Sequence, residues 1–318
     1  MTHVETVTKR LLGPWFWITA YAALAAGFYL PGDYAGLAPL TPFLLGGILF
    51  FSLLRIPFPE ITAALRDRGR WRAVAGCSAV KLLALPLLLW LPALLLAPEW
   101  ATGLLLVASM PAGLSSIAFA DLKGGDRVLA LLLVIATSAL APLTVPLLQL
   151  AAGGTVEPWA VLGRTAYIAL LLCAPFVLAQ VTRASLPVMV ARHHHRWSRG
   201  AVACSCALIF VAVAGQRHHW AGWDAHVFLV PLLASVAATA LALVTARLAR
   251  GLLGVPGAIT LGCVCVYMNN GLSVAFAARF APGDVHLLMP CLLAQVPMIA
   301  GVALIRFVVI GRRSPDPR

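Results

Sequence analysis

The segment GLSSIAFADLKGGD occupies residues 113–126, and the related segment GLSVAFAARFAPGD occupies residues 271–284. Six of the fourteen positions are identical without a gap, at a constant offset of 158 residues. Both segments are rich in small residues and end in Gly-Asp, a pair typical of a turn followed by the N-cap of a helix. One phrase written twice in this way indicates two related halves within the chain.

The composition predicts that both halves lie in a membrane. Of the 318 residues, 61% are hydrophobic and 11% are charged, and the mean hydropathy is +0.94, whereas soluble domains carry roughly a quarter charged residues. A helix needs about twenty apolar residues to cross about 30 Å of hydrocarbon. Ten stretches meet this length, near residues 14–30, 37–55, 73–96, 100–121, 127–152, 160–182, 200–216, 227–250, 257–281 and 286–310.

The distribution of basic residues predicts the orientation of these helices. Lys9 and Arg10 precede the first stretch as in a signal peptide, but no small-x-small cleavage site follows it, so we expect a helix there. With a cytoplasmic N-terminus, nineteen of the 23 Lys and Arg residues fall on the cytoplasmic side, and Arg164, Arg217 and Arg279 fall opposite. This excess predicts a multi-pass protein of the cell (inner) membrane with both termini in the cytoplasm.

The net charge of +12 is therefore a topology signal, and no nucleic-acid partner is expected. The seven cysteines lie in or beside apolar helices and are odd in number, so they give no disulfide framework. We interpret them as small apolar residues, with metal or metalloid binding as the alternative.

The ten helices divide into two repeats of five, residues 1–152 and residues 153–318, joined by the polar linker GGTVEPW. Because five is odd, the second repeat must enter the membrane from the opposite side. Inverted repeats of this kind are typical of secondary transporters, whose substrate sites lie near the midplane between the repeats.

The repeated phrase falls in the fourth and ninth helices, where we expect both to break. MPAGLSS at residues 110–116 places Pro111 and Gly113 near the middle of one span, and MNNGLS at residues 268–273 places Gly271 at the matching depth of the other. Broken backbone in a membrane is tolerated only where it is buried in protein or lines a cavity. The alternative is a pair of kinks that bind no ligand.

These residues resemble the bile acid:sodium symporter family, part of the bile/arsenite/riboflavin transporter superfamily. The resemblance rests on PAGLSS and KGGD within residues 111–126, on ATSALAPLTVPLL at 136–148 and on MNNGLSVAFA at 268–277. It implies a panel domain from helices 1, 2, 6 and 7 and a core domain from helices 3–5 and 8–10. It also implies that the broken helices 4 and 9 cross, that substrate binds between panel and core, and that the core moves to give alternating access.

The resemblance also implies where sodium ligands should lie. Where the family has hydroxyl ligands, this chain has Ser116, Thr137 and Ser138. Where the family has a Glu and a Gln in helix 9, this chain has Val264 and Met268. These are degraded sodium sites without a compensating carboxylate, which leaves sodium coupling open, with proton-coupled or sodium-independent transport as the alternatives.

Lys81 occupies the position of a family Gln in helix 3. It lies nine residues beyond Arg72, or ~13 Å along a helix, near the midplane where an ammonium is costly and usually functional. We hypothesise that the ammonium replaces the missing cation and organises the Asn269 and Asn270 carbonyls together with the helix 4 hydroxyls. The alternative is a side chain that snorkels to the interface.

We therefore interpret the protein as a secondary transporter for a small organic anion, because two half-helix N-termini and Lys81 bring positive charge to one place. The predicted binding residues are Lys81, Ser115, Ser116, Thr137, Ser138, Asn269, Asn270 and Ser273. Gln295 is a further candidate whose alternative role is an interhelical hydrogen bond.

Other function classes fit the sequence less well. A sensor or channel on the same fold stays open as an alternative, as does an arsenite-type efflux permease, although the helix 4 thiol of arsenite permeases has no counterpart here. An enzyme is not expected, since of eleven Asp and Glu residues only Asp121 falls within a span. No cofactor is expected; the expected partners are the solute and the bilayer. Substrate identity, direction of flux, coupling ion and oligomeric state are left open.

Overall fold

The computed structural model describes residues 14–152, 158–215 and 225–311. These residues are helical, and their only β-type pairing is an isolated antiparallel bridge between Ala112 and Met268. Within this part of the chain, seven segments are long and apolar enough to cross a membrane: Gly36–Leu53, Arg68–Leu96, Arg127–Ala151, Trp159–Ser185, Arg196–Ala214, Ala225–Leu248 and Val285–Ile310. Ile18–Tyr29 and Arg250–Val266 are shorter apolar helices. The protein is an all-α, multi-pass membrane protein, and the count of ten spans stays a prediction.

The chain divides into two compact units, the first formed by residues 1–57, 170–223 and 274–283. Its described helices are α2 (Pro14–Tyr29), η1 (Ala35–Leu40), α3 (Thr41–Leu53), the later part of α10 (Pro158–Ser185), α11 (Pro187–Arg192), α12 (His194–Ala214) and the end of α15 (Asn270–Phe280). In this unit α12 packs against both α2 and α3. Glycines permit the close approach, since a Cβ at Gly27 would lie 2.7 Å from Val213 and one at Gly47 would lie 2.9 Å from Cys204.

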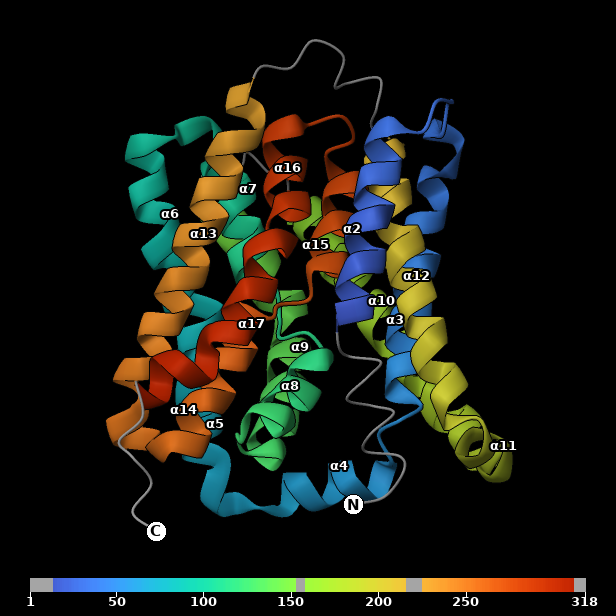
Figure 1. The fold of residues 1–318 in the computed structure, drawn as a ribbon, viewed down its shortest axis with the longest axis vertical. Helices are drawn as coiled ribbons and strands as arrows, with labels where there is room; N and C mark the ends of the chain where they lie inside the picture. The colour runs from blue at the N-terminus through green and yellow to red at the C-terminus, as the bar shows by residue number, and fades with distance from the viewer. Residues whose placement is uncertain (1–13, 153–157, 216–224, 312–318) are drawn as a thin grey trace. The chain divides into compact units, whose positions relative to one another are not determined.

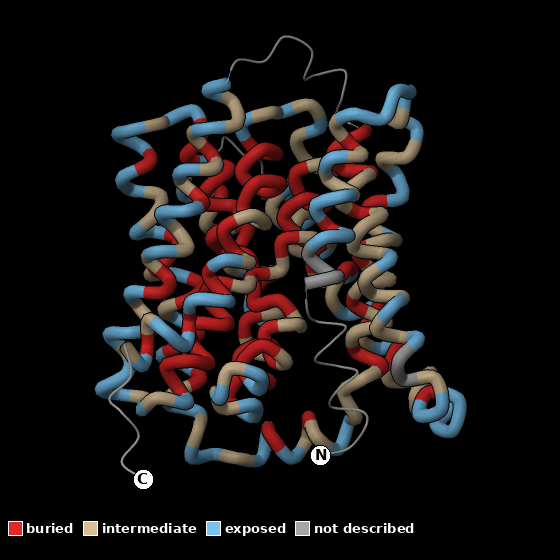
Figure 2. Tube along the Cα trace, viewed as in Figure 1, coloured by how far each residue is buried: buried red, intermediate tan, exposed pale blue. Residues whose placement is uncertain are grey.

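The second unit holds the remaining residues, 58–169, 224–273 and 284–318. Its principal helices (Figure 1) are α4 (Phe58–Arg66), α5 (Trp71–Ala79), η3 (Val80–Ala84), α6 (Leu85–Leu96), α7 (Pro98–Ser109), α8 (Ser115–Lys123), α9 (Arg127–Ala151), α13 (Ala225–Leu248), α14 (Arg250–Val266), the start of α15, α16 (Val285–Leu293) and α17 (Gln295–Ile310). Nearly all side chains of α7 and α16 are buried, as are residues 257–266 of α14 (Figure 2). Helices buried on all sides form the interior of a unit.

Both copies of the repeated phrase end in the predicted turn and N-cap. The Asp126 carboxylate accepts a hydrogen bond from the Leu129 amide at the start of α9, and Asp284 does the same for Leu287 at the start of α16. The left-handed residue of the second turn is Gly283, at φ 80°, whereas in the first turn it is Gly124, at φ 83°, one position earlier than expected.

The structure differs from the expected helices in several places. The third span is not a plain α-helix, because η3 is a π-helical turn inserted between α5 and α6. The tenth is interrupted at Ala294, and α14 begins at Arg250, with Gly254 at φ 67° breaking its first turns. The arginine-rich segment before α5 contains the short amphipathic helix α4, which was not expected. The chain termini, linker residues 153–157 and Arg217 lie outside the described residues, so their sides of the membrane stay predictions.

Candidate functional site

The fourth and ninth helices are interrupted, as predicted. α7 ends at Ser109 and α8 begins at Ser115, so Pro111 and Gly113 lie within the first interruption. The second interruption comprises residues 267–269, between α14 and α15. The prediction that Gly271 breaks this helix is wrong, because Gly271 is the second residue of α15. The helix starts earlier because the Asn269 side chain accepts a hydrogen bond from the Leu272 amide and caps it.

The two interruptions pair with each other inside the second unit. The Gly113 amide donates to the Tyr267 carbonyl at 2.9 Å, and the Asn269 amide donates to the Pro111 carbonyl at 2.8 Å. A Cβ at Gly113 would lie 2.9 Å from the Tyr267 ring, so a side chain there would push the segments apart. Each broken helix therefore satisfies backbone groups of the other, as buried backbone in a membrane requires.

Lys81 binds the end of the first half-helix. Its side chain is 1% exposed, and its Nζ donates to the Ala108 carbonyl at 2.8 Å. Ala108 lies in the last turn of α7, whose carbonyls lack partners within the helix and carry the negative end of its dipole. The ammonium therefore lies at a position that suits a cation.

The surroundings of Lys81 are otherwise apolar. It lines a cavity of about 20 Å³ together with residues of α6, α7, α13, α14 and the second interruption. These residues are Leu85, Leu89, Ala108, Ala238, Leu241, Ala242, Cys265 and Met268. No carboxylate lines this cavity among the described residues. The π-helical turn that carries Lys81 is a feature often found at functional positions. The expected contact with the Asn269 and Asn270 carbonyls is not observed in the described residues, because Nζ binds the carbonyl end of α7 instead.

Thr137 supports the first interruption from α9. Its hydroxyl is fully buried, accepts a hydrogen bond from the Ala112 amide at 3.2 Å and donates to the Leu133 carbonyl at 2.7 Å. The adjacent Ser138 is partly exposed. Thr137 thus holds a backbone donor that the break in helix 4 leaves without a helical partner.

The hydroxyls at the start of α8 differ from each other. Ser115 forms a side-chain hydrogen bond with Tyr267, the first residue of the second interruption. Ser116 is fully buried, and its Oγ has no hydrogen-bond partner within the part of the chain that the structure describes. A buried hydroxyl without a hydrogen-bond partner is costly. Within this cluster, Ser116 is therefore the residue that would gain most from a hydrogen bond to a ligand atom.

Amide side chains support the second interruption. The Asn270 Nδ2 donates to the Gln295 Oε1 at 2.9 Å, which is the interhelical hydrogen bond considered as the alternative role of Gln295. The Ser273 hydroxyl lies 2.7 Å from the Asn270 carbonyl and 3.0 Å from its Oδ1. The structure therefore brings Asn270, Ser273 and Gln295 together at the start of α15.

Comparison with known proteins decides the family. A family model described as the sodium bile acid symporter family matches residues 42–223, more than half of the chain. The chain belongs to the sodium bile acid symporter family. A comparison with curated proteins found no match. The family consists of membrane transporters, so this symporter-family member is a transporter, and the matched region contains Lys81, the first interruption and Thr137.

Two positions that the resemblance relates to sodium ligands, Val264 and Met268, carry apolar side chains. Val264 is fully buried and Met268 is 9% exposed, and neither side chain carries an oxygen. Ile117, which follows Ser116, is also buried, and its side chain likewise carries no oxygen. The described residues contain no cluster of three or more His, Cys, Asp or Glu side chains that could hold a metal ion.

Sequence reasoning missed two groups of this site. The Ala108 carbonyl was missed because any residue carries one, and only the end of α7 makes it available. Tyr267 was missed although it directly precedes MNNGLS. A tyrosine directly before the expected break in the ninth helix is the sequence signal that could have identified it.

Proposed function

We propose that the protein is a secondary active transporter that carries a small organic anion across the cell membrane by alternating access and without sodium. The observation that carries this proposal is the buried Lys81 ammonium at the carbonyl end of α7, in a chain whose Val264 and Met268 side chains carry no oxygen to bind sodium. A sodium ion at such a site would be released and rebound in every cycle. Lys81 instead carries its positive charge on a side chain, which stays part of the protein throughout the cycle.

The start of α8 and the start of α15 support an anionic substrate. Each is the positive end of a helix dipole, and each carries hydroxyl or amide groups, from Ser115 and Ser116 in one and from Asn270 and Ser273 in the other. Buried amides and hydroxyls at helix N-termini bind carboxylates and related anions readily. A lysine side chain can also gain and lose a proton, so a proton gradient is the candidate driving force.

We also propose that the fold is two inverted repeats of five helices, residues 1–152 and 153–318, in a membrane whose cytoplasmic face carries both termini. In this proposal helices 3–5 and 8–10 form the core, and helices 1, 2, 6 and 7 form the panel. The second compact unit supports the core assignment, since it gathers residues 58–169, 224–273 and 284–318. The two Asp caps at equivalent places of the repeated phrase support the repeat.

A counterflow experiment tests the proposed function. Purified protein in liposomes is loaded with one unlabelled carboxylate at a time, and uptake of the labelled compound is followed with and without a pH gradient in sodium-free buffer. A carrier gives saturable uptake that internal substrate accelerates. A channel gives uptake that internal substrate does not accelerate, and a sensor gives none, so either result across a broad set of anions would overturn the proposal.

A further inference from the structure

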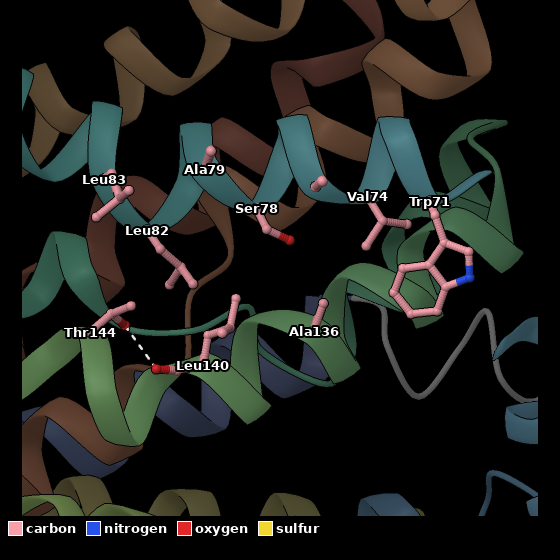
Figure 3. A pocket seen from close by; sticks show the side chains of 10 residues that line it. Trp71, Val74, Ser78, Ala79, Leu82, Leu83, Ala136, Leu140 and Thr144 are labelled. Atoms are coloured by element: carbon pink, nitrogen blue, oxygen red, sulfur yellow. Dashed lines mark hydrogen bonds between the residues drawn. The ribbon is translucent and has the colours of Figure 1, made fainter. Parts of the chain in front are cut away.

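A second cavity lies along the helical segment that carries Lys81. A groove of about 350 Å³ opens between α5 and α9, entirely within the second unit (Figure 3). It is lined by Trp71, Val74, Ala75, Ser78, Ala79, Leu82, Leu83, Ala136, Leu140 and Thr144. Lys81 is not among these residues and lines a separate cavity.

The walls of the groove suit a hydrocarbon chain. Leu83 is 46% exposed, Leu140 is 44% exposed and Trp71 is 40% exposed, so the other helices of the second unit leave this apolar lining open. Both α5 and α9 belong to segments long and apolar enough to cross a membrane. An open apolar groove along such helices is filled by an acyl chain from the bilayer.

Ser78 gives the groove one polar feature. Its side chain points from α5 into the space facing α9 (Figure 3), it is 4% exposed, and its Oγ has no hydrogen-bond partner among the described residues. Thr144 on the opposite wall differs, because its hydroxyl donates to the Leu140 carbonyl of its own helix. A buried hydroxyl that lacks such a partner calls for an acceptor from a bound molecule.

Two exposed arginines lie near Trp71 in the sequence, at one end of the groove lining. Arg68 and Arg72 flank Trp71, are exposed, and form no ion pair with any described residue. Arg70 differs, since it pairs with Asp67 and Asp126. A tryptophan beside free arginines at the end of a spanning segment is typical of the level of lipid headgroups, where basic side chains attract anionic lipids.

The spacing of these groups matches one lipid molecule. Ser78 lies seven residues beyond Trp71, or ~10 Å deeper along the helix. Leu82 and Leu83 follow within the next turns of the same groove wall. From the Trp71 end inward, this wall therefore presents Trp71, then Val74 and Ala75, then the Ser78 hydroxyl, and then Leu82 and Leu83.

We propose that the α5–α9 groove is a binding site for one anionic glycerophospholipid. Arg68 and Arg72 bind the headgroup phosphate, the Ser78 hydroxyl donates to an acyl ester carbonyl, and one acyl chain lies along Leu82, Leu83 and Leu140. The site is separate from the transport site proposed above and does not depend on the substrate carried.

Native mass spectrometry of the delipidated full chain tests this assignment, with dioleoyl phosphatidylglycerol and dioleoyl phosphatidylcholine as the two probes. The wild type is expected to retain one phosphatidylglycerol molecule with roughly 25-fold higher affinity than phosphatidylcholine, since each of the two exposed arginines contributes roughly fivefold for an anionic headgroup. The double variant R68Q/R72Q should lose this preference. Ser78→Ala should weaken both lipids by roughly threefold, the loss of one hydrogen bond.

Two groove-filling variants test the place of binding. Ala79→Trp and Ala136→Trp fill the groove from opposite walls and should each abolish the tightly bound lipid. Leu95→Trp is the matched control, because Leu95 is 86% exposed on α6 and does not line the groove. Lys81→Met should leave lipid binding unchanged even if it stops transport, which separates this proposal from the proposed function. Equal affinity for the two lipids, or full binding by both tryptophan variants, would overturn the assignment.

Discussion

The two interrupted helices are supported by different chemistry. The first interruption receives the Lys81 ammonium at the end of α7 and the Thr137 hydroxyl within the break. The second is capped by Asn269 from its own chain segment and supported by the amide pair of Asn270 and Gln295. The first interruption therefore receives a positive charge and the second receives neutral amides, so the two interruptions pair through their backbones but are supported by different side-chain chemistry.

The proposed inverted repeat requires the two copies of the repeated phrase to end on opposite sides of the membrane. Asp121 and Arg279 occupy equivalent places in the repeated phrase and are both exposed. A cysteine at Asp121 should react with a membrane-impermeant maleimide only from the cytoplasmic side, and one at Arg279 only from outside. Labelling is measured in oriented vesicles above the background of the wild-type cysteines. Reaction of both from one side would contradict the inversion.

Glycines before the two interruptions should respond very differently to a methyl group. A Cβ at Gly103 in α7 would lie 2.2 Å from the His286 carbonyl oxygen, whereas one at Gly262 in α14 would lie 3.0 Å from the Ala246 Cβ. Gly103→Ala should lower the free energy of unfolding by about 3 kcal/mol and Gly262→Ala by about 1 kcal/mol. Equilibrium unfolding in mixed micelles measures both, and equal losses would show that α7 is no more tightly packed than α14.

Thr137→Val tests the support of the first interruption. The substitution keeps the shape of the side chain but leaves the buried Ala112 amide without its acceptor, so the free energy of unfolding should fall by about 2 kcal/mol. Thr144→Val on the same helix is the control, because Thr144 donates only to Leu140 one turn earlier and should cost under about 0.5 kcal/mol. Equal effects in the same unfolding measurement would remove the special role of Thr137.

Gln295→Leu tests the support of the second interruption and should have the smallest effect. It removes the acceptor of the Asn270 amide, and hydrogen bonds between membrane helices average about 0.6 kcal/mol. The loss is measured as for Thr137→Val. A loss of unfolding free energy larger than that of Thr137→Val would show that the second interruption depends more on its side-chain support than the first.

Much of this site could be predicted from sequence, because glycine, proline and Asp caps act through their immediate neighbours. The interruption around Pro111 and Gly113 and the cap at Asp284 followed from such local rules. The start of α15 did not, since it depends on whether Asn269 or Gly271 ends the irregular segment. Local rules cannot decide between two residues only two positions apart that both suit such a position.

The partners of the buried groups could not be predicted from sequence. The Ala108 carbonyl accepts from Lys81, and the Ala112 amide donates to Thr137, across 27 and 25 residues of chain. Which backbone group a distant side chain reaches depends on packing. The π-helical turn that carries Lys81 is equally a product of packing, since nothing in VKLLA distinguishes it from an ordinary helical turn.

The central claim is that the Lys81 ammonium replaces sodium in the transport cycle. Uptake into proteoliposomes of an anion identified by counterflow is measured with sodium fully replaced by choline, for the wild type and for Lys81→Met, which keeps the side-chain volume without the charge. Lys81→Arg, which keeps the charge, and thermal unfolding of each variant serve as controls. The wild type should transport equally in both buffers, and Lys81→Met should lose at least about tenfold in rate, the effect of about 1.4 kcal/mol. Strict dependence of the wild type on sodium, or unimpaired transport by Lys81→Met, would contradict the claim.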